Sequence, residues 1–68
     1  MITLIINEES RKFKIPPKNL EDLLVQLRLN PLHVIIELNH SLYNAPSFAA
    51  TPVISGDTID IIYYMGGG

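Results

Sequence analysis

The sequence contains no cysteine and no tryptophan, and only five of its 68 residues are lysine or arginine. The missing cysteines exclude disulfide bonds, thiolate metal sites and cysteine-ligated iron–sulfur clusters. With few basic side chains and a formal net charge of -2, the chain lacks the basic face that nucleic-acid-binding proteins use. We therefore expect no nucleic-acid partner.

Long hydrophobic runs are also missing. The apolar stretches are far shorter than the roughly 20 residues that cross a membrane as a helix, and no segment has the basic start, apolar run and cleavage site of a signal peptide. We expect a cytoplasmic protein with no membrane partner, or a protein of the plastid stroma if its gene is organellar.

The composition is that of a small folded domain. Hydrophobic residues make up 47% of the chain and charged residues 18%, which is enough apolar side chain to close a core. A chain of 68 residues leaves no room for a second domain. Residues 1–65 are expected to form this domain.

The spacing of the apolar residues predicts an α+β fold with a mixed sheet of four to five strands and one helix packed across one face. Leucines at intervals of three and four predict the helix, which Asn19 caps and Asn30-Pro31 closes. The expected strands span residues 2–6, 11–15, 34–38 and 58–65, with a short edge strand and an irregular loop within residues 41–52. The expected turns are residues 7–10, 39–40 and 55–57.

Three glycines, Gly66, Gly67 and Gly68, directly follow the last expected strand. Because glycine has no Cβ, such a tail can pass through a slot too narrow for any other residue. At roughly 3.3 to 3.6 Å per extended residue, the glycines carry the Gly68 carboxylate about 10 Å beyond Met65. We expect residues 66–68 to be a flexible tail that delivers this carboxylate into another protein; a merely frayed end is the alternative.

Two segments of the chain carry a resemblance to a known family. Residues 34–39 (VIIELN), and residues 56–62 (GDTIDII) followed by the three glycines, are similar in sequence and spacing to motifs of the ThiS family of thiamine-biosynthesis sulfur carriers. The whole chain has the length of this family, and the resemblance implies a ubiquitin-like β-grasp fold. His40 departs from the glycine that commonly follows the turn asparagine in this family, and Met65 stands where a smaller apolar residue is usual.

The resemblance also implies a chemistry for the tail. A ThiF-type adenylating enzyme would attach AMP to the Gly68 carboxylate, and a sulfur donor such as a cysteine desulfurase would displace it to leave a thiocarboxylate. The thiazole synthase ThiG would then accept the sulfur. On this hypothesis the protein is a co-substrate and not an enzyme, and it needs no cofactor of its own.

The other polar residues suggest no catalytic or metal site. His33 and His40 are expected in loops on either side of the third strand, without further convergent ligands. The serines fall in predicted turns, outside any nucleophile motif. We expect neither a metal nor catalysis by the chain itself.

Strand parity predicts a surface that partners could recognise. If Glu37 and Asp60 point to solvent, the residues that share their face are Ile35, Ile62 and Tyr64, and Ile5 joins them from the first strand. Met65 is also counted among these expected contact residues. An exposed apolar patch of this kind, next to the tail, is typical of a protein contact. The alternative is that neighbouring side chains cover these residues.

Two further interpretations stay open at the level of sequence. The chain is also compatible with a sulfur carrier of another pathway, such as the small subunit of molybdopterin synthase, which shares the fold and a glycine-ended tail. It is also compatible with a ubiquitin-fold interaction module whose tail is never activated. The synthase that binds the protein, and the response of the tail to ATP and an adenylating enzyme, distinguish these alternatives.

Overall fold

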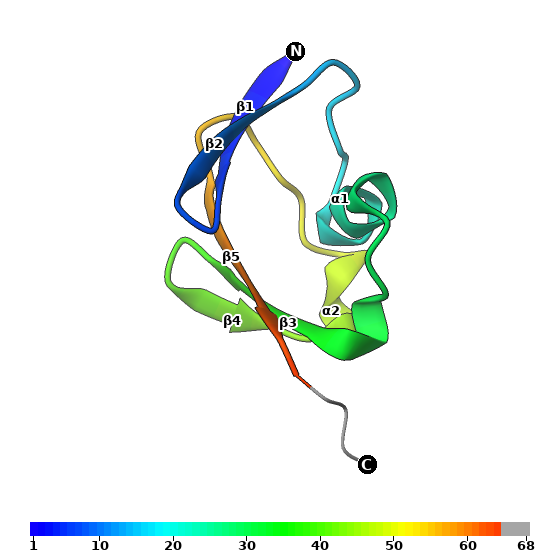
Figure 1. Ribbon diagram of the computed structural model, residues 1–68. Coiled ribbons are helices and arrows are strands. Elements are labelled where there is room, and N and C mark those ends of the chain that lie inside the picture. Colours follow the sequence, from blue (N-terminus) through cyan, green and yellow to red (C-terminus); the bar gives the residue numbers. More distant parts are fainter. Residues whose placement is uncertain (65–68) are drawn as a thin grey trace.

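A mixed β-sheet curves around one main helix in the computed structural model, which describes residues 1–64 (Figure 1). Within these residues the sheet has five strands in the order β2-β1-β5-β3-β4. The strands are β1 (Ile2–Ile6), β2 (Glu9–Phe13), β3 (Val34–Leu38), β4 (Ser41–Tyr43) and β5 (Thr58–Tyr63). β1 and β5 run parallel and the other neighbouring strands are antiparallel. The predicted α+β, β-grasp arrangement is confirmed.

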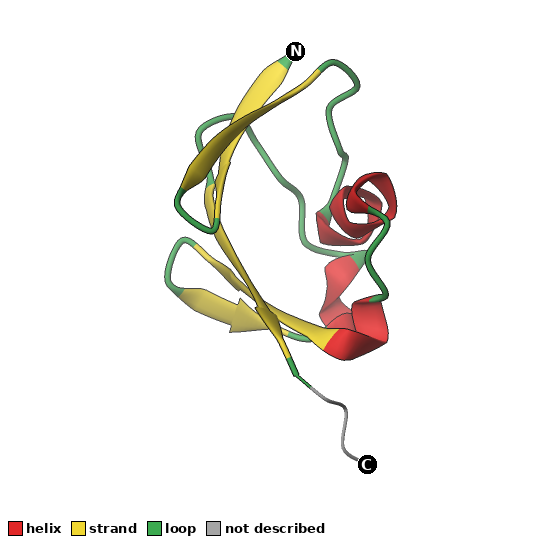
Figure 2. Ribbon diagram, viewed as in Figure 1, coloured by secondary structure: helices red, strands yellow, loops and turns green. Residues whose placement is uncertain are grey.

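The helices lie on one face of the sheet (Figure 2). They are α1 (Leu20–Leu27), the 3-10 helix η1 (Pro31–His33) and the short helix α2 (Ala45–Phe48). The side chains of β1, β3 and β5 that point towards α1 form the core with the buried face of the helix. The fully or almost fully buried residues are Leu4, Ile6, Phe13, Leu20, Leu23, Leu24, Val34, Ile36, Leu38, Phe48, Val53, Ile59 and Ile61.

Helix α1 begins where the sequence predicts. Oδ1 of Asn19 accepts a hydrogen bond from the backbone N–H of Asp22 over 2.7 Å, and Oδ2 of Asp22 accepts one from the N–H of Lys18 over 2.9 Å. The first bond satisfies an N–H group that a helix start leaves without a partner, and the second ties Asp22 to the residue before the N-cap. The leucine stripe is confirmed as core, since Leu20, Leu23 and Leu24 are completely buried.

The end of α1 differs from the prediction. The helix stops at Leu27 because Arg28 takes a left-handed conformation with φ of 61°, which closes the last turn before Asn30-Pro31 is reached. Asn30 instead caps η1, accepting a hydrogen bond from the N–H of Leu32 over 2.9 Å.

The first hairpin is also tighter than predicted. Asn7 and Glu8 alone form the turn, with φ of 50° and 70°, so β2 starts at Glu9 and ends at Phe13. The expected strand over residues 11–15 was wrong at both ends. β1 begins at Ile2, opposite Phe13, and therefore offers no partner to Lys14 or Ile15. The prolines that follow Ile15 also remove backbone donors from this segment.

The segment after β3 contains an element that the sequence analysis missed. β4 is confirmed as a short edge strand, but residues 45–48, expected as irregular loop, form α2. Pro46 lies in the first turn of this helix, where the missing N–H costs nothing. Phe48 is completely buried and joins α2 to the core.

Candidate functional site

The face of the sheet opposite the helices carries the predicted apolar residues. Ile35 of β3 and Ile62 of β5 lie directly opposite each other, and Tyr64 follows two residues after Ile62, just beyond the end of β5. The exposed fractions are 45% for Ile62 and 45% for Tyr64, while Ile35 is half-buried between its neighbours. The pairing of Ile35 with Ile62 agrees with the strand-parity argument, whereas partner binding by Ile35, Ile62 and Tyr64 stays a prediction.

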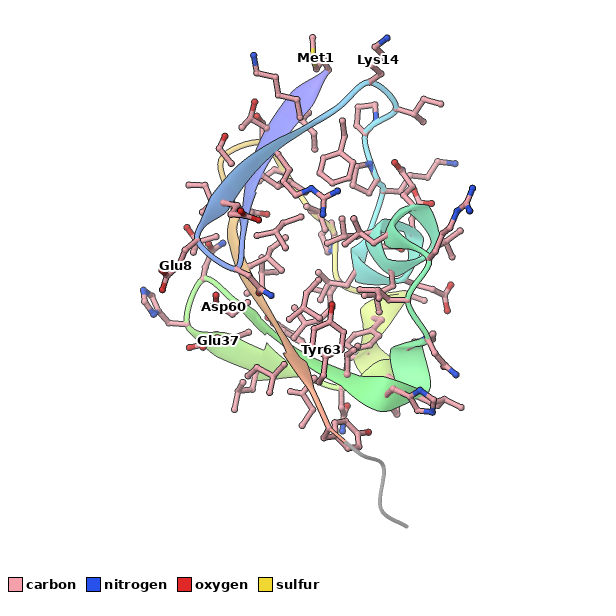
Figure 3. The ribbon with its side chains drawn as sticks, in the orientation of Figure 1. Met1, Glu8, Lys14, Glu37, Asp60 and Tyr63 are labelled. Atoms are coloured by element: carbon pink, nitrogen blue, oxygen red, sulfur yellow. The ribbon has the colours of Figure 1, made fainter. Side chains whose placement is uncertain are left out.

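Two carboxylates mark the boundary of this apolar area. Glu37 and Asp60 are paired across β3 and β5, on the side of the sheet away from α1 (Figure 3). Ile5 shares this face and is 37% exposed, but it lies beside Thr58. Thr58 and Asp60 thus stand between Ile5 and Ile62, so Ile5 is on the predicted face without adjoining the other three residues.

One apolar residue of this face was missed from the sequence. Leu42 of β4 pairs with Glu37, which places it on the outer side, and its exposed fraction is 68%. It lies diagonally next to Ile35, close enough for long side chains to touch. The residues Ile35, Leu42, Ile62 and Tyr64 are called the outer patch below.

Tyr64 fixes the point from which the chain leaves the sheet. Its phenolic O–H donates to the carbonyl oxygen of Leu32 over 3.0 Å, and its backbone N–H donates to the carbonyl oxygen of His33 over 3.1 Å. Both acceptors belong to η1, which lies between α1 and β3 in the chain. The last described residue is consequently anchored by its backbone and by its side chain.

The remaining predicted site residues, Met65 and the three glycines Gly66, Gly67 and Gly68, lie outside the described residues. The division into a domain over residues 1–65 and a tail over residues 66–68 therefore stays a prediction.

Residues 1–64 contain no group of three His, Asp or Glu side chains placed to hold a metal ion. His33 and His40 are both exposed; His40 lies in the turn between β3 and β4 as expected, whereas His33 is the last residue of η1 and does not lie in a loop. No helix in residues 1–64 is long and apolar enough to cross a membrane.

Comparison with known proteins agrees with this geometry. The family model described as the ThiS family matches residues 4–68, which is nearly the whole chain and includes the glycines. The chain belongs to the ThiS family. At this level its role is that of a small sulfur carrier in thiamine biosynthesis.

Two solved structures resemble this ThiS-family chain. The crystal structure of the thiamine biosynthesis protein ThiS from Geobacter metallireducens has 30% sequence identity and a TM-score of 0.83, and the match covers 98% of this chain and 100% of that one. A solution structure of a thiamine biosynthesis protein from the same organism has 30% identity and a TM-score of 0.78, over 98% and 88% of the two chains. A search of curated proteins found no significant match.

Proposed function

We propose that this ThiS-family protein carries sulfur on the carboxylate of Gly68. An adenylating enzyme would join this carboxylate to the α-phosphate of ATP, with release of pyrophosphate, because a free carboxylate is a poor acyl donor. Hydrosulfide, which a cysteine desulfurase releases in the presence of a reductant, would then form a bond to the acyl carbon as the acyl bond to AMP breaks, and AMP would leave. The product is a thiocarboxylate, which a thiazole synthase would use as its sulfur source.

The observation that carries this proposal is the family match through residue 68, which includes all three glycines. Glycine is suited to the step because a tail without Cβ atoms can enter a narrow active site. The anchored Tyr64 adds a fixed base from which such a tail would start. All adenylation and sulfur-transfer chemistry belongs to the partner enzymes on this proposal.

The outer patch is the surface that these enzymes would recognise. It combines exposed apolar side chains from three neighbouring strands, and it reaches Tyr64 at the base of the tail. Contiguous exposed apolar residues of this kind are common in protein contacts. An adenylating enzyme of the ThiF type and a thiazole synthase of the ThiG type would use the patch in turn.

The proposal is tested by intact-mass measurement. The purified protein is incubated with ATP, a ThiF-type enzyme and a sulfur source such as a cysteine desulfurase with cysteine and reductant. The expected result is a mass increase equal to the replacement of one oxygen by one sulfur, localised to the C-terminal peptide. The reaction without ATP is the control. An unchanged mass with a ThiF-type enzyme that is active on its own carrier would contradict the proposal.

A further inference from the structure

The strand edge of β5 is open over its last residues. Backbone bonds of β5 alternate in direction: Thr58 and Tyr64 bond towards β3, whereas the carbonyl of Ile59 accepts from the N–H of Asn7 on the other side. β1 ends at Ile6, opposite Ile59, so it does not reach the second half of β5.

The side chain of Asn7 covers only one more position of this edge. Its Oδ1 accepts from the N–H of Ile61 over 2.7 Å. Tyr63 is the next residue of β5 whose N–H and C=O point away from β3. They point to the side of β5 where β1 lies earlier in the strand, but β1 does not extend this far. Within residues 1–64 no strand pairs with Tyr63 on that side. An unpaired edge of this kind is a template for another strand.

A groove lies along this open edge, on the helix side of the sheet. Its volume is about 280 Å³, and its lining includes Ile61 and Tyr63 of β5, Arg11 of β2, and Arg28 and Leu29 after α1. Figure 3 shows Tyr63 on the side of the sheet that faces α1, opposite to the side of Glu37 and Asp60. The groove is therefore distinct from the outer patch.

The charge of the groove is positive. Two of the five basic residues in the chain, Arg11 and Arg28, line it, against one acidic residue, Glu9. A guanidinium group can bind a carboxylate through two parallel hydrogen bonds. The groove thus fits an extended segment that carries an acidic side chain.

The backbone of Arg28 gives a second reason to assign a role to its side chain. Arg28 has φ of 61°, in the left-handed region where glycine usually ends a helix. A side chain in this conformation costs on the order of 1 kcal/mol. This strain is compatible with a role for the Arg28 side chain, which lines the groove.

We propose that the groove receives an extended acidic segment of the adenylating enzyme, which adds as a strand to the open edge of β5. The backbone of this segment would bond to the N–H and C=O of Tyr63, and its carboxylate would pair with Arg11 and Arg28. The edge leads from Tyr63 into the tail, so the enzyme that acts on Gly68 passes directly beside it. This inference rests on the proposed function, because it describes how the adenylating enzyme would bind the sulfur carrier.

The backbone part is tested by amide hydrogen exchange of Tyr63 with and without a ThiF-type enzyme. We expect exchange of this amide to slow at least about tenfold in the complex, as for a new ladder hydrogen bond. An unchanged exchange rate in a complex that demonstrably forms would overturn the inference.

A pair of variants gives a second readout: Tyr63→Pro removes the N–H, whereas Tyr63→Ala keeps it. Because the bonds of β5 to β3 are made by the even-numbered residues, Tyr63→Pro leaves that ladder intact.

The charge part is tested by affinity. We expect Arg28→Gln to weaken binding to the adenylating enzyme about tenfold. The double variant that carries both Arg28→Gln and Arg11→Gln should bind still more weakly. Lys18→Gln removes the same charge from an exposed position outside the groove and is expected to leave Kd within about twofold. Equal Kd values for all three variants and the parent would reject the acidic segment.

The two proposals fail in different ways. If the parent protein gains sulfur while Tyr63 stays unprotected and Arg28→Gln binds normally, the groove is not the contact and the sulfur-carrier proposal stands. If Tyr63 becomes protected in the complex and the mass never changes, the contact is supported and the chemistry at Gly68 is wrong.

Discussion

The side chain of Asn39 ties the turn after β3 to the start of β5 through Asp57. Nδ2 of Asn39 donates to Oδ1 of Asp57 over 3.0 Å, and Oδ1 of Asn39 accepts from the N–H of Thr58 over 2.9 Å. Oδ2 of Asp57, which is 7% exposed, accepts from the N–H of Ile54 over 2.8 Å. The two segments that resemble the ThiS family thus meet at one hydrogen-bonded junction, and we expect that junction to hold the strand that leads to the tail.

Removal of the Asp57 carboxylate should destabilise the fold. Asp57→Ala leaves the N–H of Ile54 and the amide of Asn39 without their acceptor, and the free energy of unfolding is expected to fall by about 1 to 3 kcal/mol. Urea unfolding followed by circular dichroism measures the change. Asp60→Ala is the matched control: it removes a half-buried carboxylate that faces Glu37, and should change stability little or raise it. Equal losses in the two variants would refute this role for Asp57.

Glycine at position 40 should stabilise the protein. His40 has φ of 77° in the two-residue turn between β3 and β4, and Asn39 before it has φ of 48°. Such turns favour Asn-Gly, since glycine takes positive φ without steric cost. His40→Gly is therefore expected to raise the free energy of unfolding by about 1 kcal/mol.

Thermal unfolding is a suitable measurement for this change. Ser41→Gly provides the control, because Ser41 lies in β4, where glycine weakens a strand. A melting temperature that falls in His40→Gly would show that the imidazole makes a stabilising contact that outweighs the backbone strain.

A charge in the outer patch should weaken partner binding without unfolding the protein. Ile62→Glu places a carboxylate at a position that is 45% exposed, next to Ile35. Kd for the adenylating enzyme or the thiazole synthase is expected to rise at least about tenfold, as for a buried interface residue. Calorimetric titration gives this value directly.

Val25→Glu serves as the control for this experiment. Val25 is 67% exposed on α1, on the other side of the molecule from the outer patch, and it should tolerate the charge without a change in Kd. If both variants bind like the parent, the outer patch is not an interface.

Deletion of Gly67 and Gly68 should abolish sulfur loading and leave the domain folded. Neither residue belongs to the described domain, whose last strand ends at Tyr63. The melting temperature is therefore expected to stay within about 2 °C of the parent, a shift that corresponds to well under 1 kcal/mol for a domain of this size. Intact-mass measurement reports the loss of loading. A truncated protein that still gains sulfur would place the acceptor elsewhere.

The parts of the fold that depend on local sequence were predictable. Asn19 and the leucines that follow it specify α1 by capping and spacing alone, and the structure has this helix start. The alternation in residues 34–38 and 58–63 was equally local, and it placed Ile35 and Ile62 on the outer face correctly. One strand period is enough to assign a face once a polar reference such as Glu37 is known.

The missed features depend on pairing between distant segments. The limits of β2 follow from where β1 begins, and the placement of Leu42 follows from its pairing with Glu37. Residues 45–48 are too few to show helical spacing, so α2 had no periodic signal. The open edge at Tyr63 exists only because β1 stops early, which no segment of the sequence shows by itself.

The anchoring of Tyr64 on η1 fixes the point from which the reach of the chain end is counted. From the Tyr64–Leu32 hydrogen bond onward, each residue adds at most about 3.6 Å to the distance that Gly68 can reach. On the proposed function, an enzyme that binds the sheet would therefore discriminate between carriers by the length of the tail. We then expect insertion of a single glycine to carry the terminal carboxylate past the reaction centre of this enzyme and deletion of one to leave it short, even with every contact on the domain preserved.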